Sequence, residues 1–177
     1  MLENFKKAIF RVLCLGLLGG GLMAEPNPEE LVDLGVKSIE AKDYIQAKKY
    51  FEKACDLKYG GGCSNLGVLY QNGQVVEKDL TKAAYLYSKA CDLKEGLGCF
   101  NLGALYYNGK GVEKDLIKVA YFYSKACDLK EGMGCGNLGV LYYNGDGVKR
   151  DSKKADQYFS KACKLGVKEA CEALKEK

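Results

Sequence analysis

The chain has 177 residues, of which 28% are charged and two are prolines, and its formal net charge is +4. This length and composition indicate one folded unit of a soluble globular protein. Without the basic start, which carries Lys6, Lys7 and Arg11 against Glu3, the net charge is +2. No cluster of lysine or arginine follows, so the sequence argues against nucleic acid as a partner.

The first 24 residues have the pattern of an export signal. Lys6, Lys7 and Arg11 precede an apolar run, Val12 to Met23, that is too short to span a bilayer. We expect cleavage at Ala24 or a few residues earlier, a retained N-terminal helix being the alternative. The mature protein is then periplasmic or secreted and has no membrane segment.

Cysteines give the clearest signal in the remaining sequence. Without Cys14, which lies in the export signal, eight cysteines remain, and an even number in an exported chain favours disulfides. They form four pairs with eight positions between the members and 36 between successive pairs: Cys55/Cys63, Cys91/Cys99, Cys127/Cys135 and Cys163/Cys171. This spacing does not fit a zinc site and the chain has no histidine, so we expect no metal and no other cofactor.

The amino-acid sequence around the cysteines repeats with the same period of 36 residues. We expect a short first repeat at 25–60, full repeats at 61–96, 97–132 and 133–168, and a terminal half-repeat at 169–177. A period of this size is typical of a solenoid, in which each repeat buries its apolar face against its neighbours.

Each full repeat contains two predicted helices. In the second full repeat, 97–132, apolar residues recur at helical intervals from Cys99 to Asn108. Gly109 then ends this first helix of the repeat, which we call helix A. Asp115 stands where an N-cap carboxylate would accept hydrogen bonds from the free amides of the next helix. This second helix, helix B, is expected to run to about Lys130.

Two simple disulfide pairings respect the repeat. One joins the members of each pair, and the other joins Cys63 to Cys91 and the equivalent residues. The second pairing leaves Cys55 and Cys171 without partners. The first uses all eight cysteines, and it explains why Leu31 occupies the matching position in the opening repeat, which has no preceding helix B. We therefore predict that each disulfide joins one repeat to the next.

The motif residues of one repeat resemble the Sel1-like repeat, a relative of the tetratricopeptide repeat. They are Leu102-Gly103, Tyr106, Asn108-Gly109, Gly111-Val112, Asp115, Lys118 and Tyr123 to Cys127. With its paired cysteines and its signal, the chain after Ala24 resembles the Helicobacter cysteine-rich protein family. The resemblance implies an all-α fold, a right-handed α/α superhelical solenoid of antiparallel helix hairpins with disulfides between adjacent repeats. It also implies penicillin binding with weak β-lactamase activity, or a secreted factor that meets the host immune system.

Residues for a known β-lactamase mechanism are not found. A serine enzyme of that class needs S-x-x-K and a KTG-like strand, and neither motif occurs. Ser88, Ser124 and Ser160 are each followed directly by lysine, a spacing that points the two side chains of a helix in different directions. A zinc hydrolase would need histidine. The catalytic residues of any such activity are therefore unknown.

Ligand-binding candidates come from the resemblance, which places helix A along a concave groove. The groove positions are Asn65, Asn101 and Asn137, and Gln71, Tyr107 and Tyr143. Amides can hold a peptide backbone, and tyrosines supply apolar area with a polar tip. The structural alternatives are hydrogen bonds from the asparagines to neighbouring backbone and ordinary packing of the tyrosines. Our leading hypothesis is a secreted module that binds a peptide or protein, host-derived ligands included; the alternatives are a protein that binds β-lactams or cell-wall-related small molecules, and a structural envelope protein.

Overall fold

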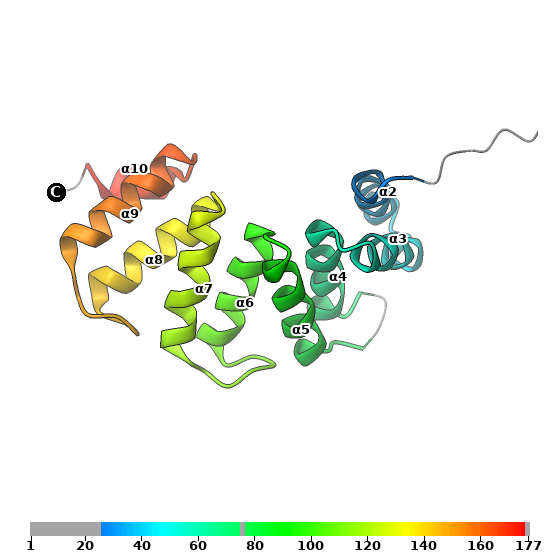
Figure 1. The fold of residues 1–177 in the computed structure, drawn as a ribbon, viewed down its shortest axis with the longest axis horizontal. Coiled ribbons are helices and arrows are strands. Elements are labelled where there is room, and N and C mark those ends of the chain that lie inside the picture. Colours follow the sequence, from blue (N-terminus) through cyan, green and yellow to red (C-terminus); the bar gives the residue numbers. More distant parts are fainter. Residues whose placement is uncertain (1–25, 75–76, 176–177) are drawn as a thin grey trace, which may run out of the picture.

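The computed structural model describes residues 26–74 and 77–175, and within these ranges the chain forms helices, turns and no β-strand. The helices are α2 (Pro28–Glu40), α3 (Tyr44–Asp56), α4 (Gly60–Asn72), α5 (Leu80–Asp92), α6 (Gly96–Asn108), α7 (Leu116–Asp128), α8 (Gly132–Asn144), α9 (Ser152–Lys164) and α10 (Lys168–Ala173). Each helix packs on the next, and Figure 1 shows a single curved row with α2 and α10 at opposite ends. This is the predicted all-α solenoid of helix hairpins.

The proposed export signal and Cys14 lie outside the described residues. Within the described residues, none of the helices has the length and apolar character needed to cross a bilayer.

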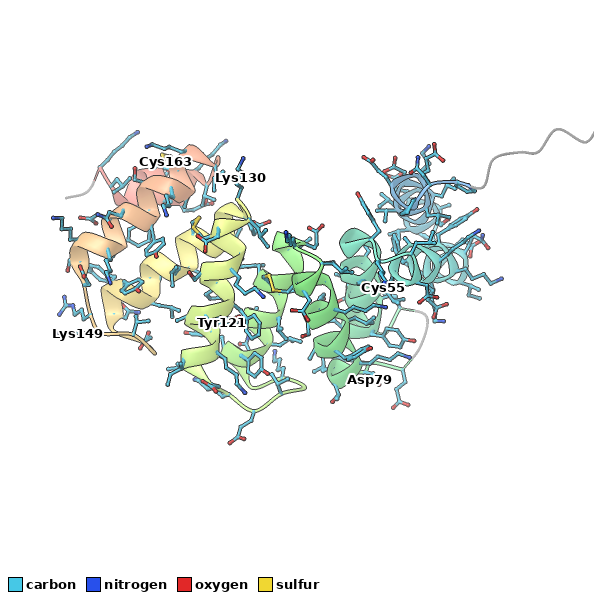
Figure 2. All side chains as sticks on the ribbon, viewed as in Figure 1. Cys55, Asp79, Tyr121, Lys130, Lys149 and Cys163 are labelled. Carbon is cyan, nitrogen blue, oxygen red and sulfur yellow. A yellow bond between two sulfur atoms is a disulfide. The ribbon has the colours of Figure 1, made fainter. Side chains whose placement is uncertain are left out.

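The ends of the helices follow from residues that recur in every repeat. The side chain of an aspartate caps each helix B, as Asp79 does by accepting from the Lys82 amide at 2.8 Å and Asp151 by accepting from the Lys154 amide at 2.9 Å. Each full helix A ends in a left-handed glycine, such as Gly109 with φ 62°. The predicted aspartate caps and glycine stops are confirmed. In Figure 2, Asp79 and Lys130 mark the two opposite edges of the row at which helices B begin and end.

The turn from helix B to the next helix A uses a backbone conformation that favours glycine. Lys58, Lys94 and Lys130 have φ between 60° and 65°, in the left-handed region. Gly166, with φ 92°, holds the equivalent place after α9. The turn is the same in each repeat, because the amide after the left-handed residue reaches back into the helix, as Glu95 N does to Ala90 O at 3.0 Å.

Helices A form the inner layer of the curve. Helices α2, α4 and α6 each contact the next helix A along the row, whereas consecutive helices B lie farther apart. Since the layer with the closer neighbours lies at the smaller radius, the helices A line the concave side, as the resemblance implied.

Disulfides join each helix B to the following helix A. The bonds are Cys55–Cys63, Cys91–Cys99, Cys127–Cys135 and Cys163–Cys171, the same pairs that the repeat symmetry favours. The Cα atoms of Cys91 and Cys99 are 4.5 Å apart. Gly98 permits this approach, because a Cβ atom there would lie 2.5 Å from the Ala90 Cβ. Gly62 and Gly134 have equally close neighbours, so the two helices approach closely beside the first three bonds.

Packing within a repeat is also repeated. The rings of Tyr87, Tyr123 and Phe159 on helices B each lie against a helix A glycine, at a distance that a methyl group would not allow. In the same hairpins, a lysine ammonium lies over a tyrosine ring, as Lys154 does at 5.2 Å from the Tyr142 ring centre. The skeleton of every full repeat thus has the same contacts.

Candidate ligand-binding face

The inner face carries two cavities, each between consecutive helices A at the carboxyl-terminal half of the row. The first has a volume of about 240 Å³ and lies between α6 and α8. The second has a volume of about 320 Å³ and lies between α8 and α10. Asn137 and Val140 of α8 line both cavities. We call these two spaces the α6–α8 cavity and the α8–α10 cavity.

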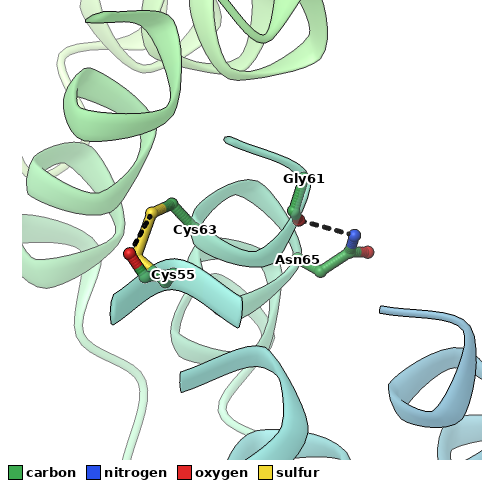
Figure 3. The surroundings of a disulfide bond; sticks show 4 residues. All are labelled: Cys55, Gly61, Cys63 and Asn65. Carbon is green, nitrogen blue, oxygen red and sulfur yellow. Dashed lines mark hydrogen bonds between the residues drawn. A yellow bond between two sulfur atoms is a disulfide. The ribbon is translucent and has the colours of Figure 1, made fainter. Parts of the chain in front are cut away.

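The three candidate asparagines have different surroundings, although they hold the same place in each repeat. Asn65 donates from Nδ2 to the Gly61 carbonyl at 2.8 Å, on the side of α4 away from the Cys63 disulfide (Figure 3). The half-buried Asn101 side chain forms no hydrogen bond with any residue that the structure describes. Asn137 lies beside the Tyr123 hydroxyl in the α6–α8 cavity. The three positions thus differ: Asn65 bonds to its own helix, Asn101 has no partner among the described residues, and Asn137 lies in a cavity.

The second set of candidates, Gln71, Tyr107 and Tyr143, also has different surroundings in each repeat. Gln71 accepts a hydrogen bond from the Tyr87 hydroxyl at 3.0 Å, so its side chain supports the packing of the first full repeat. Tyr107 and Tyr143 are 45% and 46% exposed. Lys114 lies 5.5 Å from the Tyr107 ring centre, and the guanidinium of Arg150 lies 5.8 Å from that of Tyr143. One face of each exposed ring is thus occupied by a cation from the loop that follows helix A.

The α6–α8 cavity combines aromatic, amide and carboxylate groups. Its lining consists of Tyr107, Tyr123, Asn137, Val140, Leu141 and Asp146. Burial raises the pKa of the Tyr123 hydroxyl, while hydrogen bonding from Asn137 acts in the opposite direction. The hydroxyl therefore stays protonated at neutral pH and can donate or accept, which suits a peptide group or another neutral polar ligand.

The α8–α10 cavity is mainly apolar. Its lining consists of Met133, Gly136, Asn137, Val140, Phe159, Val167, Glu169, Ala170 and Ala173. Polar groups enter from Asn137 and Glu169 alone among these residues. A site of this composition suits an apolar side chain or a small apolar ligand that is oriented by a few polar contacts.

The structure brings together Asn137 and Tyr107. It leaves Asn65, Asn101, Gln71 and Tyr143 outside both cavities. Sequence reasoning missed the other lining residues because it considered only positions that repeat. A signal was present at one position, which is Ser64, Phe100 and Gly136 in successive repeats, and such variation inside a regular helix marks a place where the scaffold does not dictate the residue.

The lysine that follows Ser124 on α7 contacts other groups. Lys125 lies 3.8 Å from Asp92 Oδ1 and 5.6 Å from the ring centre of Tyr121. Its ammonium group is thus directed toward these two side chains. Over the residues that the structure describes, histidine, cysteine and acidic side chains form no group of three or more that could hold a metal ion.

Comparisons with known proteins agree with this architecture. The Sel1 repeat family matches residues 34–59, 61–95, 96–131 and 133–167, which together are most of the chain. Cysteine-rich protein B of Helicobacter pylori is 40% identical over 88% of this chain and 100% of its own, with a TM-score of 0.59. A protective antigen of uropathogenic Escherichia coli with the same type of fold is 30% identical over 84% of this chain and 32% of its own, with a TM-score of 0.77.

Among the curated relatives, HcpC of Helicobacter pylori, whose name includes β-lactamase, is 71% identical over 79 residues. The match covers 44% of this chain and 27% of HcpC, so the chain spans about a quarter of that relative. The four matched repeats, the paired cysteines and the full-length match to cysteine-rich protein B lead to one conclusion. The chain belongs to the Sel1 repeat proteins and, among them, to the Helicobacter cysteine-rich protein family.

Proposed function

We propose that the protein is an exported interaction module that binds an extended peptide, or an extended segment of a protein, on its inner face. The observation that carries the proposal is the pair of cavities on either side of α8, whose linings include Tyr107, Asn137 and Val140. Asn101 holds the place on α6 that is equivalent to Asn137. This part of the molecule offers half-buried amides, a half-exposed ring and two recesses that are separated by one helix.

An extended peptide fits these features because its amide groups and side chains alternate in direction. Asn101 has an amide without a hydrogen-bond partner among the described residues, so it can donate to a peptide carbonyl and accept from a peptide N–H. Side chains of the peptide would enter the two cavities. Hydrogen bonds to the peptide backbone do not depend on the sequence of the peptide, so the two cavities would supply the selectivity.

Disulfides support a place of action outside the cytoplasm, in the periplasm or the medium. Four disulfides close short loops in this chain, and such bonds persist in oxidising compartments. The partner is then a peptide or protein met there, of bacterial or host origin.

The test is a selection of binding peptides followed by substitution of the asparagines. A random peptide library displayed on phage is selected against the oxidised protein, and the affinities of synthetic copies are measured by fluorescence anisotropy. The double variant Asn101→Ala/Asn137→Ala should weaken binding roughly tenfold or more, since each lost hydrogen bond contributes about 0.5–1.5 kcal/mol.

Asn65→Ala is the matched control. The Asn65 amide already bonds to the carbonyl of Gly61, so its loss should leave peptide affinity nearly unchanged. Failure of the library to yield a saturable ligand, or equal effects of the control and the double variant, would refute the proposal.

The second candidate function is β-lactam binding with slow hydrolysis, and it is supported by the β-lactamase names of the relatives, as in HcpC and HcpA of Helicobacter pylori. Its test is the hydrolysis of a chromogenic cephalosporin by oxidised protein purified through several independent columns. Turnover that stays proportional to the protein through each column would favour this function over the first.

A further inference from the structure

Gly136 differs from the other glycines of its helix. In α8, a Cβ atom at Gly134 would lie 2.6 Å from the Ala126 Cβ, and one at Gly139 would lie 2.8 Å from the Phe159 ring. These two glycines are required by close packing. A Cβ atom at Gly136 would meet only the Ala162 Cβ, at the ordinary contact distance of 3.7 Å. The scaffold therefore has room for a side chain at this place.

Glycine inside a helix also lowers helix stability, because only proline is a poorer residue there. The preceding repeat shows how the place can be filled. Phe100 is the equivalent of Gly136, and its ring stacks on Tyr123 with the ring centres 5.6 Å apart. In the last repeat the α8–α10 cavity lies beside Gly136 and Phe159. The missing side chain leaves this space open.

The charged residues that line the two cavities are acidic, while Lys114 lies over the outer face of the Tyr107 ring. Asp146 is the one charged residue that lines the α6–α8 cavity, and Glu169 is the one charged residue that lines the α8–α10 cavity. Neither carboxylate forms an ion pair with a residue that the structure describes. A ligand that spans α8 would therefore gain from basic groups near both ends.

We infer that Gly136 keeps open an anchor site for one large apolar side chain, of leucine or phenylalanine size, in a peptide with basic residues next to that anchor. The inference rests on the proposed function and names the kind of peptide that the inner face selects. The apolar wall formed by Met133, Val140 and Phe159 would surround the anchor, and Asn137 would bond to the peptide backbone beside it. The volume of about 320 Å³ is at the lower end of ligand sites, as expected for one side chain.

The experiment uses the phage-selected peptides and two variants at one position. Gly136→Ala leaves the cavity open, whereas Gly136→Phe fills it as Phe100 fills its counterpart. We expect the selected peptides to share a leucine, phenylalanine or methionine with lysine or arginine nearby. Gly136→Phe should weaken their binding roughly ten- to a hundredfold, and Gly136→Ala should change it less than threefold. Replacing the anchor of the peptide by alanine should cause the same loss as Gly136→Phe.

A second variant, Ala173→Phe, closes the cavity from α10 and covers the case in which Gly136→Phe perturbs α8. Circular dichroism of each oxidised variant checks the fold. Binding that both filling variants leave unchanged, while Asn101→Ala/Asn137→Ala abolishes it, would overturn the anchor site and retain the proposed function. Peptides selected without an apolar or basic residue in common would also overturn it, and the absence of any selected peptide would refute both proposals.

Discussion

The repeat formed by α6 and α7 and the repeat formed by α8 and α9 have the same skeleton and different inner faces. In both, an aspartate caps helix B, a disulfide fixes helix A to the preceding repeat, and a lysine lies over a tyrosine. On the inner face, Phe100 becomes Gly136 and Tyr123 becomes Phe159. The difference teaches that contacts between repeats restrict the skeleton, whereas the inner face can vary without loss of the fold.

The largest expected effect comes from the disulfides, where the two repeats should behave alike. The variants Cys91→Ala/Cys99→Ala and Cys127→Ala/Cys135→Ala should each lower the free energy of unfolding by roughly 2–3 kcal/mol, because each bond closes a similar short loop. Urea denaturation followed by circular dichroism measures both. A difference larger than about 1 kcal/mol between the two variants would show that the skeletons are not equivalent.

The second effect should have opposite signs at two glycines. Gly98→Ala forces a methyl group against Ala90 and should lower the free energy of unfolding by about 1–3 kcal/mol. Gly136→Ala meets no such obstacle and should raise it by about 0.5–1 kcal/mol, the ordinary gain of alanine over glycine in a helix. Urea midpoints of the two variants decide the matter. Destabilisation by Gly136→Ala would mean that this glycine also has a packing role.

The skeleton could be predicted from the sequence because each of its contacts uses residues that recur. The cysteine pairs, the aspartate caps and the glycine stops recur at a fixed period. Leu31 replaces the helix A cysteine in the first repeat, which has no preceding helix B to bond to. These features depend on local geometry and on the adjacent repeat, which has nearly the same sequence. One correct repeat therefore determines the next.

The candidate site could be predicted only in part, because its properties depend on residues that do not recur. Asn65 and Asn137 look equivalent in the sequence, but one bonds to its own helix and the other lies beside Tyr123. The α8–α10 cavity arises because Gly136 has no side chain, and a sequence pattern does not show which spaces remain unfilled. Neighbouring side chains in three dimensions decide both cases.

A third comparison concerns the turns that follow α7 and α9. Lys130 has φ 65° after α7, while Gly166 holds the corresponding place after α9. Lys130→Gly should raise the free energy of unfolding by about 0.5–1 kcal/mol, and Gly166→Lys should lower it by a similar amount, since a side chain is strained in this region. Thermal midpoints of the two variants provide the measurement, and shifts of the same sign would contradict the expectation.

The smallest effect comes from the buried tyrosines, and it appears only at alkaline pH. Burial raises the pKa of Tyr123 in the folded protein above its ordinary value of 10.0. As the pH rises, the tyrosine of the unfolded chain loses its proton before that of the folded protein. The free energy of unfolding is therefore unaffected by this group below pH 10 and falls as the pH rises above it. Tyr123→Phe should make the fall smaller, and Phe159→Tyr should make it larger. Urea midpoints at several pH values between 8 and 11 would show whether these slopes change in opposite directions.

The positions of the disulfides also determine how the chain responds to proteolysis. Each bond spans only the turn from helix B to the next helix A, as Cys91–Cys99 spans residues 92–98. A protease that cuts within such a turn leaves two pieces that stay covalently joined until a reductant is added. The loop from Gly109 to Asp115 lies outside all four bonds, so one cut there divides the chain into separate fragments without reduction.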